Sequence, residues 1–270
     1  MNGGRFRTSL LMQLREYRAR ALPLVMVALL PMGMWAASFF SLPADVTVPA
    51  QELESYTAGI GPLAWTEIPV RDNWPEFTLL MGVAWALGAA ALFSVIGSGS
   101  RDQRLVLAGF RPWEIMLARF LILLSIAVPV SLITVMVIAG FSTLPPPNIG
   151  LVWLGLFFTA AVGAAIGLIA GSLLPRPLEG TLLLLGIIGL EMMTPFSVSF
   201  RHYLPLYGAQ ALFLAGRFTT EPINLTNVLR SLAWAAGLSA FAIALWTWRV
   251  RIFKASAVPR ASASVDQSSS

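Results

Sequence analysis

Long apolar runs alternate with short polar segments along the 270 residues of this chain. A helix needs about 20 mostly apolar residues to cross the roughly 30 Å hydrocarbon core of a bilayer. Six runs approach or exceed that length, so we predict six membrane-spanning helices, at about residues 21–41, 77–97, 114–140, 151–174, 178–199 and 230–249. The predicted fold class is all-α, a polytopic membrane domain over residues 21–252. The first run is too long for the apolar part of a cleavable signal peptide, so we expect it to be retained.

Residues 1–20 have a helical pattern but are too polar to span a membrane. Phe6, Leu10, Leu14 and Tyr17 fall on one stripe of a helix, with arginines around it. This pattern predicts an amphipathic helix that lies flat in the interface, where arginines meet lipid phosphates. An ordinary positively charged flank of the first span is the alternative.

A second apolar segment, residues 205–215, is also too short to cross. Pro205 suits the start of a helix and Gly216 suits its end. We predict a short re-entrant helix on the outer side, with an ordinary outer loop as the alternative.

A charged segment lies between the second and third apolar runs. Its Ser100 and Gln103 fit a capping box that begins a helix, and Gly109 suits a helix end. The residue before Pro112 disfavours helix, whereas Pro112 itself suits the first position of the next one. We therefore predict a separate short helix at about 101–108, a break, and then the third span.

Basic residues favour the cytoplasmic side of a membrane. With six spans, 14 of the 18 basic residues fall on the side that also holds both termini. We therefore expect both termini, and the short helix, to be cytoplasmic. The opposite side holds an acidic loop at residues 42–76, and residues 253–270 form a serine- and alanine-rich tail that we expect to be disordered.

Composition narrows the function classes. The chain is 57% hydrophobic and 11% charged, against about 25% charged residues in soluble domains. Its basic residues gather at the ends of apolar runs, which argues against nucleic-acid binding. It has no cysteine and one histidine, His202, which excludes thiolate metal sites and argues against a zinc enzyme. An intramembrane serine protease would need that histidine beside a serine, but His202 and Ser172 are expected at opposite sides.

The short helix would offer apolar groups beside water on the cytoplasmic side. An apolar tip framed by arginines is typical of a docking site for a soluble partner, and a helix resting on lipid headgroups is the alternative. The docking candidates are Arg101, Asp102, Arg104, Leu105, Val106, Phe110 and Arg111.

Glu191 is the one acid well inside a predicted span. Exposing an ionisable group to lipid is costly, so such a group is a functional candidate by default. Glu191 could line a translocation path, pair with Arg201 or His202 near the same outer end, or make a structural hydrogen bond to a neighbouring helix.

The layout from Arg5 to about Arg251 resembles the ABC type-2 permease family, the membrane subunits of many bacterial ABC exporters. The resemblance is carried by Arg101-Asp102-Gln103-Arg104-Leu105-Val106-Leu107-Ala108-Gly109-Phe110-Arg111-Pro112-Trp113-Glu114 and by Tyr203-Leu204-Pro205 after the fifth run. It implies an interfacial N-terminal helix, six spans, cytoplasmic termini, a coupling helix between spans two and three, and re-entrant outer helices.

The resemblance further implies that residues 101–111 dock into a separate ATP-hydrolysing subunit, which binds the ATP and magnesium. A second permease chain, identical or different, would complete the pathway in a bacterial inner membrane. The chain has no GxxxxGK[ST] motif and its only lysine is Lys254 in the tail, so we expect no cofactor and no enzymatic activity in this chain. A non-transporting assembly or structural subunit and an intramembrane enzyme are the alternative classes.

Overall fold

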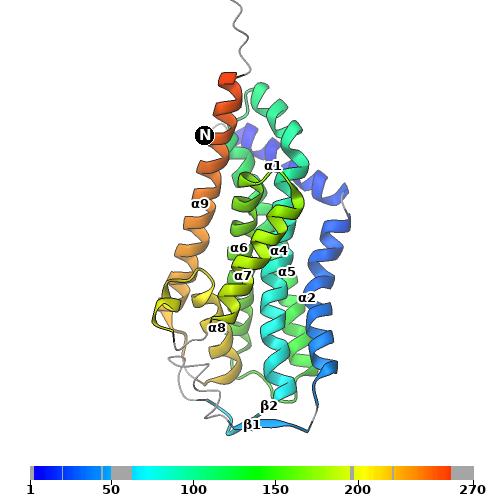
Figure 1. Ribbon diagram of the computed structural model, residues 1–270, viewed down its shortest axis with the longest axis vertical. Coiled ribbons are helices and arrows are strands. Elements are labelled where there is room, and N and C mark those ends of the chain that lie inside the picture. The colour runs from blue at the N-terminus through cyan, green and yellow to red at the C-terminus, as the bar shows by residue number, and fades with distance from the viewer. Residues whose placement is uncertain are drawn as a thin grey trace, which may run out of the picture.

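The computed structural model describes residues 3–19, 21–43, 45–49, 63–194, 198–220 and 222–256. Long helices lie side by side along the longest axis of the molecule (Figure 1). In chain order the elements are α1 (Gly3–Ala19), α2 (Ala21–Ser41), β1 (Thr47–Pro49), β2 (Glu67–Pro69), α4 (Val70–Leu107), α5 (Pro112–Phe141), α6 (Ile149–Leu173), α7 (Pro177–Met193), the 3-10 helix η1 (Ser199–Tyr203), α8 (Tyr207–Phe218) and α9 (Leu225–Ser256).

Four helices, α4, α5, α6 and α9, are long and apolar enough to cross a membrane. They indicate a helical membrane protein, which confirms the expected fold class in its coarser form. Helix α2 has 21 residues and α7 has 17. The predicted fifth span, 178–199, is wrong at its end because α7 stops at Met193. Thr194 precedes a proline in the sequence and is extended, with ψ 122°.

The two ends of the bundle differ in what they carry (Figure 1). One end, called here the terminal end, holds α1, the turn between α4 and α5, and the C-terminal part of α9. The other, the hairpin end, holds α8 and the antiparallel pair β1 and β2, in which Val48 lies opposite Ile68. The predicted acidic loop at 42–76 contains both strands and the first turns of α4. Residues 44 and 50–62 lie outside the described part of the chain.

The centre of the bundle is the contact between α4 and α6, which depends on small residues. A Cβ atom placed on Gly167 would lie 2.0 Å from the carbonyl oxygen of Gly88, and one on Gly163 would lie 2.5 Å from that of Ala84. Glycines spaced four residues apart let two helix backbones touch, and this is how helices associate in a bilayer, where hydrophobic burial supplies little drive.

Helix α4 corrects the prediction of a separate helix at 101–108. It runs without interruption from Val70 to Leu107, so the second predicted span and the short helix are one element. Ser100 therefore lies inside a helix and caps nothing. The neighbouring Ser98 hydroxyl donates to the Ser94 carbonyl oxygen at 2.6 Å, a bond within the helix that serine readily makes. The predicted stop at Gly109 and the new start at Pro112 are confirmed.

The last two helices also differ from expectation. Helix α8 begins at Tyr207 rather than at Pro205, and it continues past Gly216 to Phe218. The glycine allows close packing instead, since a Cβ there would lie 2.6 Å from the Val152 nitrogen of α6. Helix α9 continues to Ser256, so the first residues of the predicted disordered tail are helical. Residues 257–270 lie outside the described part.

Helix α1 packs against α5 and also touches α2. Tyr17 is buried, as the predicted stripe requires, but Phe6, Leu10 and Leu14 are half-buried. The most buried positions on α1 include the polar Ser9 and Gln13. The side of α1 that faces the protein is thus rotated from the purely apolar stripe.

Candidate functional site

The turn between α4 and α5 is a closed hydrogen-bonded structure at the terminal end. The Phe110 N–H donates to the Leu105 carbonyl oxygen at 3.0 Å, and the Gly109 N–H donates to that of Val106 at 3.1 Å. This pair of bonds is the Schellman motif, which requires a left-handed residue, and Gly109 has φ +92°. The motif normally includes an apolar contact between the residues at the positions of Leu105 and Phe110, and both are half-buried.

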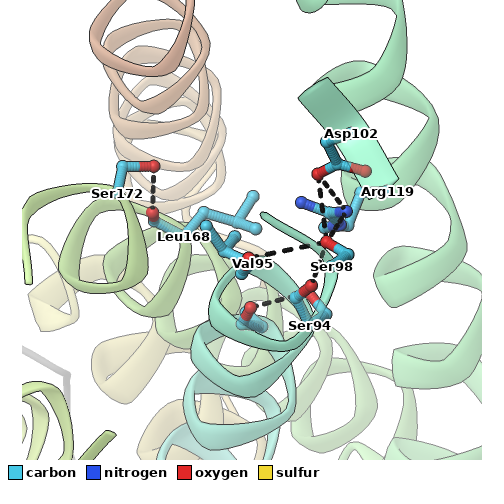
Figure 2. Close-up of polar contacts among 8 residues, drawn as sticks. Ser94, Val95, Ser98, Asp102, Arg119, Leu168 and Ser172 are labelled. Carbon is cyan, nitrogen blue, oxygen red and sulfur yellow. Dashed lines mark hydrogen bonds and ion pairs between the residues drawn. The ribbon is translucent and has the colours of Figure 1, made fainter. Parts of the chain in front are cut away.

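A buried polar cluster joins α4 to α5 beside this turn (Figure 2). Arg119 Nη2 donates to Asp102 Oδ2 at 2.9 Å and to Ser98 Oγ at 2.5 Å. Both members of the ion pair have 0% side-chain exposure. The ion pair links α4 to α5 across the turn between them, and its two residues are 17 positions apart in sequence.

Glu114, in the first turn of α5, is buried as well. Among the described residues, Glu114 Oε2, Asp102 Oδ1 and the Nε and Nη1 atoms of Arg119 make no hydrogen bond. This end of α4 and α5 therefore holds one guanidinium and two carboxylates away from solvent.

The structure divides the predicted docking residues into two groups. Asp102 and Val106 are buried within the chain, so their assignment to a docking surface is wrong: they face α5 and the core. Arg101, Leu105 and Phe110 are half-buried, and Arg104 and Arg111 are exposed. The difference arises because residues 101–107 are the last turns of α4, which packs against α5, and not a separate helix surrounded by water.

Leu107 is the residue that sequence reasoning missed at this turn. It is 74% exposed and lies in the last turn of α4, between the exposed Arg104 and Arg111. The sequence signal that could have found it is its spacing: Leu107 comes three residues after Arg104, so a helix places both on the same side. The exposed residues at the tip of the turn include Arg104, Leu107 and Arg111, and Leu107 is the one large apolar side chain among them.

Glu191 lies at the other end of the bundle, in the last turn of α7. Its carboxylate accepts a hydrogen bond from the backbone N–H of Leu206, the residue that precedes α8, and the side chain is buried. Acids are favoured at helix N-termini, where backbone N–H groups lack partners. Of the three roles left open by the sequence, this geometry displays the structural bond to a neighbouring helix, together with an electrostatic interaction with Arg201.

Arg201 of η1 lies near that carboxylate and bonds to Gln210 of α8. Burial lowers the pKa of the Arg201 guanidinium to about 10, and the charge of Glu191 opposes that shift. The guanidinium is therefore still protonated at neutral pH. Glu191 and Arg201 together hold the start of α8 against the end of α7.

A second buried ion pair, absent from the sequence reading, holds the hairpin end together. Arg217 Nε of α8 donates to Glu76 Oε1 of α4 at 2.5 Å, and Arg217 Nη1 donates to the Leu144 carbonyl oxygen at 2.6 Å. One helical turn before Glu76, Asp72 accepts the backbone N–H groups of Thr143 and Leu144, each at 3.1 Å from Oδ2. Both acids fall within the predicted outer loop at 42–76. The sequence gives no sign of their pairing because their partners lie about 70 and 141 positions away.

No protein-family model matches the chain, and a search of curated proteins finds no match. Among the described residues, no group of three or more His, Cys, Asp or Glu side chains is placed to hold a metal ion.

Proposed function

We propose that this chain is the membrane-spanning permease subunit of an ABC transporter, an exporter, and that the tip of the α4–α5 turn docks on a separate ATPase subunit. One observation carries the proposal: Leu107 is exposed between Arg104 and Arg111 on a turn whose two helices are joined by the buried ion pair of Asp102 and Arg119. A mobile loop could not transmit force, whereas a turn fixed in this way moves together with the two helices that it joins.

The proposal assigns six spans to the chain. Helices α2 and α7 join the four longer ones, and both run along the bundle beside them (Figure 1). At 1.5 Å per residue, the 17 residues of α7 extend about 26 Å, close to the thickness of the hydrocarbon core. The terminal end is then cytoplasmic, in a bacterial inner membrane, and α1 lies along the inner interface with Arg7, Leu11, Met12 and Arg15 on its exposed side.

In this scheme α4 is the moving element. Its 38 residues extend about 57 Å, far more than the membrane thickness, so its C-terminal turns project beyond the bilayer. A push on the tip passes to α5 through the Arg119–Asp102 bond and to α6 through the glycine contacts at the bundle centre. A second permease chain, identical or different, supplies the other half of the pathway.

The test is to co-express the chain with ATP-hydrolysing subunits from the same organism, to purify the complex, and to compare ATP hydrolysis with and without the chain. Leu107→Asp and Arg111→Glu should abolish co-purification and stimulation without lowering the amount of the chain in the membrane. Arg176→Glu is the matched control, because Arg176 is an exposed arginine in the other turn at the terminal end. Normal coupling in both tip variants would reject the docking role.

A further inference from the structure

A partly open cleft of about 140 Å³ lies at the terminal end, on the side of α4 that faces away from the buried ion pair. Its walls come from α4, the turn between α6 and α7, and α9. The residues that matter most among its lining are Ile96, Gly99, Gln103, Leu174, Trp246 and Arg249. The wall is mostly apolar, with its polar groups at the α4 and α9 sides.

Helix α4 has two different faces at this level. Ser98 and Asp102 turn toward Arg119 of α5 (Figure 2), whereas Ile96, Gly99 and Gln103 face the cleft. A Cβ atom on Gly99 would meet nothing within 4 Å. The glycine is therefore not needed for close packing here, unlike Gly167, and its missing side chain leaves the cleft open.

Two side chains of α9, Trp246 and Arg249, line the cleft. The Arg249 guanidinium is held at the wall because Nη1 donates to the Ser172 carbonyl oxygen. A guanidinium has five N–H groups in all, so others can donate to an acceptor in the cleft. Trp246 is only 5% exposed and its indole nitrogen is shielded from solvent, so the ring serves as an apolar part of the wall.

The charge of the lining selects the class of ligand. Among the described residues around the cleft there is one cation, Arg249, and no carboxylate. A water molecule could accept from the Arg249 guanidinium but would not match the apolar walls, whereas an anionic headgroup with an acyl chain matches both. Tryptophan and arginine at helix ends are typical of the membrane–water boundary, and basic pockets between transmembrane helices are sites for anionic lipid headgroups.

We propose that this cleft binds an anionic phospholipid, with its phosphate oxygens on the Arg249 guanidinium and its first acyl carbons along Ile96, Leu174 and the Trp246 ring. The site is separate from the docking tip, and it requires only that the terminal end lie at a membrane surface. It does not depend on the transport function proposed above.

The full-length chain in nanodiscs of phosphatidylcholine with a graded fraction of phosphatidylglycerol provides the test. Native mass spectrometry after release from the nanodisc counts the lipids that remain bound. We expect the wild type to retain phosphatidylglycerol over phosphatidylcholine. Gly99→Leu, which fills the cleft, and Arg249→Gln, which removes the cation from its described lining, should each lower that retention at least tenfold.

Two matched controls should leave retention unchanged. Gly140→Leu places the same side chain on another helical glycine with open space around it, and Arg176→Gln removes an exposed arginine at the same end. An unchanged melting temperature of the cleft variants shows that they fold, and two different substitutions keep the test decisive if one of them does not.

Four results would overturn the proposal, the last of them in a shortened chain. One is equal retention of both lipids by the wild type, and another is full retention by Gly99→Leu. The third is displacement of the bound lipid by millimolar inorganic phosphate, which would assign the cleft to a small anion. Shortening the chain after Ser256 tests whether the tail occupies the cleft: unchanged retention supports a lipid site, and retention that appears only after shortening contradicts it.

Discussion

Arg119 reaches from the third turn of α5 to Asp102 near the end of α4, 2.9 Å between Nη2 and Oδ2, and neither side chain is exposed. The two charges neutralise each other away from water, so either one alone would be left unpaired in a low-dielectric interior. Removing one member of a buried ion pair typically costs about 3–5 kcal/mol, whereas replacing both by apolar residues of similar size is often neutral.

For this pair we predict a strongly non-additive cycle. Asp102→Leu and Arg119→Met should each lower the free energy of unfolding by about 3–5 kcal/mol, and the double variant should recover most of that loss. The measurement is the melting temperature of the purified chain in detergent, followed by tryptophan fluorescence. Arg104→Met, an exposed arginine on the same helix, is the control. Simple addition of the two single effects would mean that the pair is not an energetic unit.

The turn itself should depend on the backbone of Gly109. An L side chain at φ +92° costs roughly 1–2 kcal/mol, so Gly109→Ala should destabilise the chain by about that amount and increase amide exchange in residues 105–111. Gly186→Ala is the comparison, since Gly186 is helical and a Cβ there meets nothing within 4 Å; alanine should be neutral or stabilising at that position. Equal stability of the two variants would argue against the left-handed turn.

The contact between α4 and α6 should be the least tolerant place in the bundle. In Gly167→Ala the new Cβ would lie 2.0 Å from a carbonyl oxygen of Gly88, so a helix backbone must move, and overpacking of this kind costs about 1–3 kcal/mol or more. Gly140→Ala, at an open helical position, should have no such effect. The amount of monodisperse protein and its melting temperature give the readout, and a fully stable Gly167→Ala would contradict the close approach of the two backbones.

Glu191 is expected to hold the start of α8. Glu191→Leu removes the acceptor of the Leu206 N–H and leaves that donor buried, which costs about 1–3 kcal/mol. We predict faster amide exchange over residues 204–210, with α4 and α6 unaffected. Glu179→Leu serves as the control because Glu179 is an exposed acid on the same helix whose ion pair, in the described part of the chain, is with the exposed Arg176. If transport fails in Glu191→Leu while exchange stays at the wild-type rate, the residue acts in the pathway rather than as an anchor.

Local stereochemistry explains which parts of the turn could be predicted. Gly109 and Pro112 were read correctly because their backbone preferences act over one or two residues. The predicted helix start at Ser100 failed because a capping signal is only a local option: Ser98 bonds within the helix instead, and the burial of Asp102 against Arg119 favours continuing α4.

The amino-acid sequence by itself determined the membrane class and the approximate place of the apolar segments, because the transfer free energy of a segment is nearly the sum over its own residues. The tertiary structure alone decided which charges are buried and with what partner. Asp72, Glu76 and Asp102 look alike in sequence as acids near span ends, yet each binds a group that lies 17 to 141 positions away. Such pairing depends on how each helix is rotated and what packs against it, and this is a property of the assembled bundle rather than of any one segment.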